Sequence, residues 1–236
     1  MTSDGEPRRS ARDAYAEATR DQFDTPELQL GPWTSDSLLN DPKHMCFVLA
    51  RYKFCAKMFE GKGVVLEVGA GDGFGLPLVA QAVGQLYALD WDRRLLDGNA
   101  RRLAHLKNVT YLYADLNDSA PDVSVGGAYS IDVIEHIDPT KEATFVENIL
   151  QCLKPNGVLL TGTPNVTAAQ YASSRSHAGH INLKSMETLR QLMECYFENV
   201  FMFGMNDEVV HTGYPAMCHY LWSLAVGVRS TWRRRS

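Results

Sequence analysis

The sequence predicts an α/β fold in which a doubly wound, mainly parallel β-sheet carries helices on both faces. Two observations support this prediction. Short apolar runs that suit strands buried on both faces recur through the middle of the chain. The first run, residues 64–68, leads into a glycine-rich turn at 69–75, where missing Cβ atoms let the backbone approach a ligand. With 236 residues and 45% hydrophobic content, the chain can bury the core of one such domain.

The chain before the first strand is expected to form a tail, a helix and a lid. Residues 1–13 are polar and charged and are predicted to be a disordered tail. Residues 14–24 are predicted to form a short helix. Residues 25–40 contain prolines and show no periodicity, so an ordered loop or lid is expected there.

A longer helix is predicted from Asp41, a capping acid that precedes Pro42, up to Gly61. Its apolar residues fall on one stripe, so it is expected to pack beside the first strand. Residues 14–61 are therefore assigned to N-terminal helices and a lid, and residues 62–236 to the main domain. Three side chains are candidate lid residues, ordinary packing being the simpler role for each: Tyr15, Trp33 and Arg51.

The first strand and its turn read E-x-G-x-G-x-G from Glu67 onward. A dinucleotide-binding fingerprint would need a small residue where this chain has Phe74. An acid at the strand end followed by glycines favours a cationic, phosphate-free ligand. The segment resembles the first motif of class I S-adenosylmethionine-dependent methyltransferases. The resemblance implies that the cofactor lies against Glu67, Gly69, Ala70, Gly71, Asp72 and Gly73.

The second strand, predicted at residues 86–89, ends at Asp90 and Trp91. In the family that the chain resembles, an acid here accepts hydrogen bonds from both ribose hydroxyls, and the indole would cover the adenine. The structural alternatives are that Asp90 caps the following helix and that Trp91 belongs to the core.

Two further strand ends match the same family pattern. The strand at residues 109–113 is followed by Asp115 and Leu116, and the resemblance implies that Asp115 accepts the adenine amino group; a turn cap is its structural alternative. The strand at residues 128–131 is followed by Asp132, which the resemblance assigns to the methionine part of the cofactor. Unrelated α/β domains would need several coincidences in register to show these landmarks together.

The rest of the chain completes the sheet of this family. The predicted elements are a turn at 153–157, a strand at 158–163, a helix at 184–195 and strands at 199–205 and 219–228. The last two strands match the antiparallel hairpin that closes the sheet of the family. The prediction is a Rossmann-like seven-stranded sheet in the order 3-2-1-4-5-7-6, with strand 7 antiparallel.

Two loops on the ligand side, residues 164–182 and 206–217, are expected to carry the acceptor substrate. They combine aromatic rings, a fixed cation and titratable rings, which suits a polar, anionic or glycosidic molecule; a mobile solvated loop is the alternative. The substrate-binding candidates are Tyr171, Arg175, His177, His211 and Tyr214.

His136 and His180 are the candidate general bases, because an imidazole titrates near neutral pH. His136 follows the fourth strand in a pattern similar to that of the ubiquinone-biosynthesis-type methyltransferases, and His180 precedes a helix much as a histidine does in those relatives. A structural hydrogen bond is the alternative for each. Asp132, Glu135 and His136 could also hold a divalent ion. Because Asp132 is assigned to the cofactor, no metal is predicted.

Composition restricts the partners. The net charge of −5 and the lack of a basic stripe argue against nucleic acid. Five cysteines without a C-x-x-C pair suit a reducing compartment, and neither a signal peptide nor a membrane span is expected. These observations predict a cytoplasmic enzyme, monomeric or homodimeric, that acts on a small molecule.

The predicted reaction is methyl transfer from S-adenosylmethionine to a hydroxyl or amine of a small polar molecule, such as a sugar, nucleoside or secondary metabolite. The product of the cofactor would be S-adenosylhomocysteine. The alternative is an S-adenosylmethionine-binding enzyme of natural-product biosynthesis that catalyses another reaction on the same fold.

Overall fold

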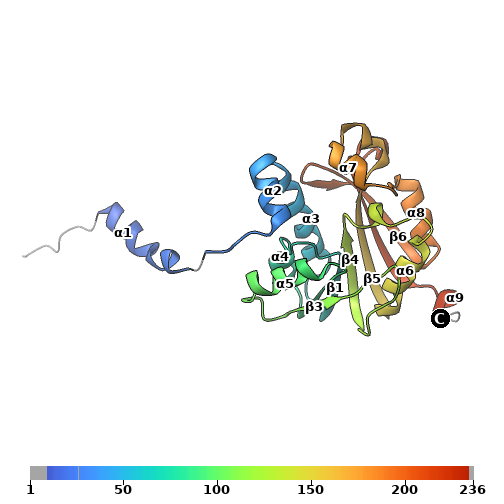
Figure 1. Cartoon of the computed structure of the whole chain (residues 1–236), viewed down its shortest axis with the longest axis horizontal. Helices are drawn as coiled ribbons and strands as arrows, with labels where there is room; N and C mark the ends of the chain where they lie inside the picture. The colour runs from blue at the N-terminus through green and yellow to red at the C-terminus, as the bar shows by residue number, and fades with distance from the viewer. Residues whose placement is uncertain (1–9, 26, 234–236) are drawn as a thin grey trace, which may run out of the picture.

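A single sheet of eight strands forms the centre of the computed structural model, which describes residues 10–25 and 27–233 (Figure 1). The strand order is β3-β2-β1-β4-β5-β8-β6-β7. The strands are β1 Val64–Val68, β2 Gln85–Asp90, β3 Val109–Tyr113, β4 Val125–Ile131, β5 Leu153–Pro164, β6 Phe197–Asn206, β7 Val209–His211 and β8 Tyr220–Val228. Strands β1 to β5 are parallel, whereas β8 pairs antiparallel with β5 and β6. The predicted fold is confirmed, and β7 adds an eighth strand at the edge beyond β6.

Helices cover both faces of this sheet. The helices of the described chain, of which α1 lies apart from the sheet, are α1 Ala11–Ala18, α2 Pro32–Asn40, α3 His44–Met58, α4 Leu76–Ala80, α5 Arg93–Arg102, α6 Glu142–Cys152, α7 Ser174–Gly179, α8 Met186–Glu194 and α9 Ser230–Arg233. Shorter 3-10 turns are η1 Arg20–Asp24, η2 Ile134–His136, η3 Val166–Tyr171 and η4 Pro215–Met217. No helix in the described ranges is both long and apolar enough to cross a lipid bilayer.

The sheet separates two apolar cores. Successive strand residues point to opposite faces, so Val65 joins the core beneath α3 and α4, whereas Leu66 joins the core beneath α6 and α8. Phe59 and Phe145 are fully or nearly fully buried in these two cores. The carboxyl ends of the parallel strands therefore stay open between the helices of the two faces, which positions the site described below.

Four segments differ from the sequence-based expectation. The predicted loop at 25–40 contains α2, because Asp72, a residue far along the chain, caps this helix. The predicted turn at 153–157 is the start of β5, where Leu153 pairs with Val125. The expected loops at 164–182 and 206–217 contain η3 with α7, and β7 with η4.

The N-terminal arm has little contact with the sheet. Helix α1 begins at Ala11, inside the predicted tail, and residues 1–9 lie outside the described residues. Figure 1 shows α1 clear of the main body, and Tyr15 is 72% exposed. Tyr15 therefore does not lie over either of the pockets described below.

Candidate active site

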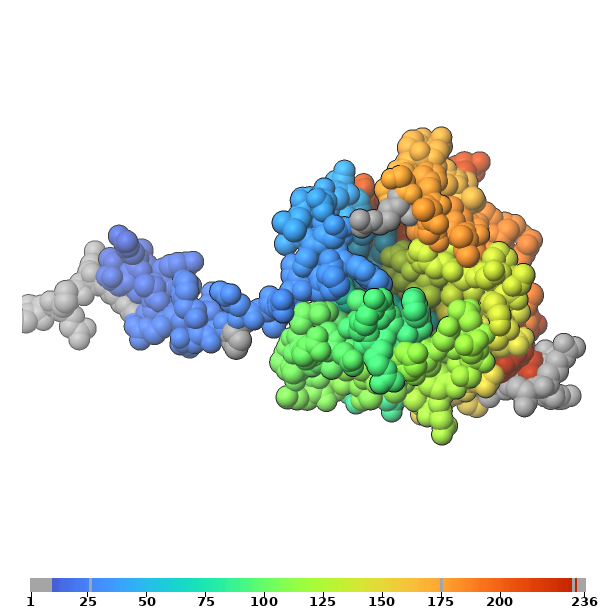
Figure 2. Space-filling model, in the orientation of Figure 1, coloured from blue at the N-terminus to red at the C-terminus, as the bar shows by residue number. Residues whose placement is uncertain are grey.

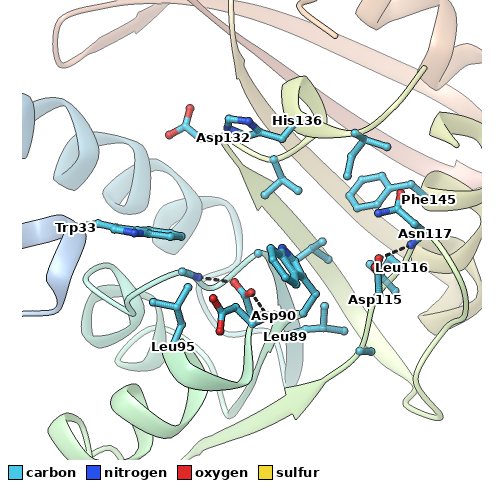
Figure 3. A pocket seen from close by; sticks show the side chains of 18 residues that line it. Trp33, Leu89, Asp90, Leu95, Asp115, Leu116, Asn117, Asp132, His136 and Phe145 are labelled. Atoms are coloured by element: carbon cyan, nitrogen blue, oxygen red, sulfur yellow. Dashed lines mark hydrogen bonds between the residues drawn. The ribbon is translucent and has the colours of Figure 1, made fainter. Parts of the chain in front are cut away.

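A cavity of about 650 Å³, here called the strand-end pocket, opens at the carboxyl ends of β1 to β4 (Figure 3). Space filling shows the surface hollowed between the blue N-terminal helices and the yellow-green segment after β4 (Figure 2). Its polar walls include several of the predicted cofactor residues: Gly69, Gly71, Asp90, Trp91, Asp115 and Asp132, with the apolar Leu116 beside them. The chain thus brings together residues from four separate strand ends, as expected for a doubly wound sheet.

The glycine turn after β1 is shaped by close neighbours. Gly69 and Gly71 have φ angles of 77° and 53°, which L-residues with side chains rarely adopt. A Cβ at Gly69 would lie 2.3 Å from the side chain of Val133, and one at Gly71 would lie 2.9 Å from the ring of Trp33. The turn therefore exposes its backbone to the pocket, as the sequence predicts.

Asp90 is held with both carboxylate oxygens oriented. Its Oδ2 accepts the N–H of Gly71 at 2.9 Å, and its Oδ1 accepts the N–H of Asp92 at 2.8 Å (Figure 3). Burial raises the pKa of Asp90, although these backbone donors oppose the shift. Each oxygen keeps a free lone pair, so the carboxylate can still accept hydrogen bonds from a ligand.

The loop after β3 forms the opposite end of the strand-end pocket. Asp115 Oδ1 accepts the N–H of Asn117 at 2.9 Å, and Leu116 is buried. The buried Oδ1 of Asn117 has no hydrogen-bond partner within the described part of the chain, so it can accept a ligand donor. Asn117 was not foreseen from the sequence, because only the folded loop turns its amide toward the pocket. The apolar wall comprises Leu89, Leu95, Val133, Ile137 and Phe145.

Four predicted cofactor residues do not line the pocket. Glu67 is 1% exposed and accepts hydrogen bonds from the hydroxyls of Tyr52 at 2.9 Å and Tyr129 at 2.6 Å. Burial raises its pKa to about 8, even though the two tyrosine hydrogen bonds lower it. This corrects the prediction that Glu67 contacts a ligand, because its side chain points into the core beneath α3.

The other three serve the turn itself. Asp72 accepts hydrogen bonds from Thr34 and caps α2, and Gly73 packs against Asn99. Ala70 is buried and its N–H donates to the carbonyl of Leu89 at 2.9 Å. These three residues hold the glycine turn in place and do not line the pocket.

A second cavity of about 620 Å³, here called the histidine pocket, lies beside the first. Asp132 lines both cavities and marks their junction. The rings that line the histidine pocket are His44, Phe47, Tyr171, His177, His180, His219 and Tyr220. They come from α3, η3, α7 and the start of β8, so this wall is built from segments far apart in the sequence.

A partly buried ion pair forms the floor of the junction. Arg51 Nη1 donates to Asp132 Oδ2 at 2.7 Å, and the guanidinium lies 3.9 Å from the ring centroid of Tyr220. Arg51 is 8% exposed. Asp132 has a φ of 56°, in the left-handed region that non-glycine residues seldom occupy. The cation of α3 therefore fixes the acid that follows β4 at the meeting point of both pockets, and Arg51 lines the histidine pocket from below rather than covering it.

Glu135 lies directly behind this junction. Its Oε2 accepts the hydroxyl of Thr163 at 3.0 Å, whereas its buried Oε1 has no partner among the described residues. Burial and the nearby Asp132 carboxylate raise the pKa of Glu135 to about 8. Burial therefore favours the neutral form of this side chain more than water would.

His136 and His180 meet between the two pockets. Their ring centroids are 4.9 Å apart in an edge-to-face arrangement, with His136 lining the strand-end pocket and His180 the histidine pocket. His136 Nδ1 lies 2.9 Å from the carbonyl of Gly179, which only accepts, so this nitrogen carries the proton in that contact. Its Nε2 is then free to accept a proton. Burial, followed by the charge of His136, lowers the pKa of His180.

The family of the chain is shown by comparison with known proteins. Residues 42–196, well over half of the 236, match the family described as "Methyltransferase domain". The chain belongs to this family. The predicted resemblance is thereby confirmed.

Two curated relatives of this methyltransferase domain bear the name "probable S-adenosylmethionine-dependent methyltransferase". One, from Mycolicibacterium smegmatis, is 34% identical over 102 residues, which are 43% of this chain and 38% of the relative. The other, from Mycobacterium tuberculosis, is 29% identical over 143 residues, which are 60% of this chain and 51% of the relative. The matches thus span about half or less of the relatives' own length.

A solved structure shares the fold of this methyltransferase domain. It is a 1,6-didemethyltoxoflavin-N1-methyltransferase from Burkholderia thailandensis, crystallised with 1,6-didemethyltoxoflavin and S-adenosylhomocysteine. The TM-score is 0.61 at 16% identity, over 95% of this chain and 94% of that chain.

The predicted substrate residues do not all lie at the same site. Tyr171 and His177 line the histidine pocket, and their role in substrate binding stays a prediction. The side chain of Arg175 lies outside the described residues. His211 and Tyr214 do not line it: His211 bonds Asn206 at 2.8 Å within the β6–β7 hairpin, and Tyr214 is 71% exposed. Both ring nitrogens of His211 form hydrogen bonds within or next to the hairpin. The expected loop at 206–217 therefore contributes no residue to the histidine pocket, contrary to the prediction.

One group of side chains could hold a metal ion. Glu135, His136 and His180 each offer a ligand atom, and these atoms lie within 4.8 Å of one another. The unpartnered Oε1 of Glu135 fits such a role, because a carboxylate and two imidazoles suit a transition metal such as Zn²⁺. The sequence-based expectation of no metal stays a prediction.

Proposed function

We propose that the protein transfers a methyl group from S-adenosylmethionine, bound in the strand-end pocket, to a hydroxyl or amine of a small polar molecule bound in the histidine pocket. The observation that carries this proposal is the junction of the two cavities at Asp132, with His136 and His180 on either side. Both volumes, about 650 and 620 Å³, fall in the range of small-molecule sites.

The residues of the strand-end pocket suit the cofactor. The oriented carboxylate of Asp90 would accept the ribose hydroxyls, and Asp115 with the unpartnered Asn117 amide oxygen would accept the adenine amino group. Asp132 would face the methionine ammonium, since its Oδ1 has no partner among the described residues. The apolar wall between these acids would enclose the adenine ring.

S-adenosylmethionine supplies an electrophilic methyl group on a sulfonium. The protein has to hold the acceptor atom in line with that methyl group and close to it, and the two adjoining pockets would do so. An acceptor O–H or N–H also loses a proton. We propose that the free Nε2 of His136, or the imidazole of His180, takes it, because both rings stand at the junction.

Metal-assisted transfer is the second candidate. It is favoured by the grouping of Glu135, His136 and His180 and by the unpartnered Oε1 of Glu135. An ion there would polarise an acceptor hydroxyl. Chelation followed by re-addition of single divalent metals separates the two versions: base catalysis predicts unchanged turnover, whereas metal-assisted transfer predicts loss and recovery.

The five cysteines support the proposed cytoplasmic setting, since each is a free thiol in the described structure.

The test is incubation of the protein with methyl-labelled S-adenosylmethionine and a panel of sugars, nucleosides and phenols. We expect S-adenosylhomocysteine and label in one acceptor class. Cofactor binding with conversion of an acceptor but no S-adenosylhomocysteine would instead favour the non-methylation alternative.

A further inference from the structure

Helix α2 is tied to the glycine turn by a cap that comes from another part of the chain. The N–H of Thr34 donates to Asp72 Oδ2 at 2.7 Å, and its hydroxyl donates to Asp72 Oδ1 at 3.0 Å. Both side chains are buried. The residue at the N-cap position of α2 is Gly31, which has no side chain to serve this purpose. Asp72 therefore takes the place of the N-cap side chain and satisfies the N–H of Thr34, which has no partner within the first turn of the helix.

The local packing allows this cap to close. A Cβ at Gly31 would lie 2.5 Å from the Asp72 side chain, so only glycine lets the two segments approach. Asp72 follows Gly71 directly, and a Cβ at Gly71 would collide with the ring of Trp33. The cap thus fixes how closely the first turn of α2 approaches the glycine turn.

Trp33 is the residue that this arrangement positions. Its indole extends from α2 into the strand-end pocket, above Leu95 in the view of Figure 3 and on the side opposite Phe145 and Asn117. Trp33 is 59% exposed, a large fraction for a tryptophan, which is highly buried on average. A ligand in the pocket would bury much of this apolar surface.

We propose that Trp33 is a cofactor-binding residue and that Asp72 is its positioning residue, which holds the indole over the cofactor by capping α2. This inference rests on the proposed function, because it requires S-adenosylmethionine or its product in the strand-end pocket. It also gives Asp72 a role that acts through Trp33 rather than through direct contact with the ligand.

The test measures S-adenosylhomocysteine affinity by calorimetry in the wild type and in Trp33→Ala, Asp72→Ala and the double variant. We expect each single variant to bind at least about 10-fold more weakly. Because Asp72 acts through Trp33, the double variant should bind no more weakly than Trp33→Ala. Independent losses that add in the double variant would overturn the positioning role.

Further variants protect the test against misfolding. Thr34→Ser keeps both donors to Asp72 and should bind as the wild type does, whereas Thr34→Val loses the hydroxyl and should bind several-fold more weakly. Leu39→Ala, an exposed change on the same helix, should leave affinity unchanged. Trp33→Ala with wild-type affinity would overturn the inference, and a wild type that binds no S-adenosylhomocysteine would overturn the proposed function itself.

Discussion

The strand-end pocket and the histidine pocket share Asp132 but are built in different ways. The first is assembled mainly from short segments that directly follow β1, β2, β3 and β4, with Trp33 of α2, Leu95 of α5 and Phe145 of α6 added by packing. The second combines α3, η2, η3, α7 and β8, and its central ion pair joins residues 81 positions apart. The comparison teaches that the polar residues of the cofactor-type site are mainly local in sequence, whereas the acceptor-type site depends on tertiary packing.

The difference extends to the buried charges. In the strand-end pocket, Asp90 is held by backbone donors. In the histidine pocket, Asp132 is held by the side chain of Arg51. Changes to the ion pair of the histidine pocket should therefore mainly lower the free energy of unfolding, while changes to Asp90 in the strand-end pocket should mainly lower the affinity for the cofactor.

The largest effect is expected from Arg51→Met, which leaves Asp132 without its partner. Because the side chain of Asp132 is 33% exposed, we expect the free energy of unfolding to fall by about 2–4 kcal/mol, near the lower range for broken buried pairs. Chemical denaturation would measure it. Lys57→Met, which breaks an exposed pair with Glu60 at the end of α3, is the matched control and should change stability by less than about 1 kcal/mol. Equal effects from both variants would contradict the buried role of Arg51.

Asp90→Ala tests the strand-end pocket. Loss of the carboxylate removes the proposed ribose hydrogen bonds, and we expect S-adenosylhomocysteine binding to weaken by about 2–4 kcal/mol in calorimetry. The control is Asp97→Ala, an exposed acid on α5, which should bind normally. Unchanged affinity in Asp90→Ala would show that the end of β2 does not contact the ribose.

The histidine pair tests the junction. His136→Ala or His180→Ala should lower turnover by roughly 100-fold or more while S-adenosylhomocysteine affinity stays near normal, because a base acts only on the acceptor proton. His211→Ala is the matched control, since His211 bonds within its hairpin away from both pockets. Full turnover in both single variants would exclude base catalysis by these rings and leave transfer by proximity alone.

The last variant, Glu67→Gln, is expected to change the pH dependence of stability, by a small amount over any narrow pH interval. The pKa of Glu67 is raised to about 8 by burial, so between about pH 5 and 8 the folded state holds a proton that the unfolded chain has released. The stability contributed by this proton is present at low pH and is lost as pH rises through 8. Glu67→Gln should flatten the stability profile by up to about 1.4 kcal/mol per pH unit.

Unfolding curves at several pH values would measure this change. Glu208→Gln, an exposed acid in the β6–β7 turn, should keep the wild-type slope. A slope in Glu67→Gln equal to that of the wild type would mean that Glu67 does not control the profile.

The sequence predicted the fold correctly, and several of its candidate cofactor residues lie around one pocket, because these signals are local. Buried parallel strands read as apolar runs, and the acids that follow them meet at one edge of the sheet. The same reasoning failed for Glu67 and Asp72, which are acids in the expected motif. Which face a side chain points to, and which partner it meets, depended on Tyr52 from α3 and Thr34 from α2.

By itself, then, the sequence determined the α/β sheet, its glycine turn and the strand-end positions of Asp90, Asp115 and Asp132. Only the tertiary structure decided that Arg51 pairs with Asp132, that His136 meets His180, and that α2 forms over the turn. The physical reason is range. Strand patterns and turns follow from neighbours along the chain, whereas ion pairs, ring contacts and a cap supplied from a distant loop exist only once the packed core has brought those segments together.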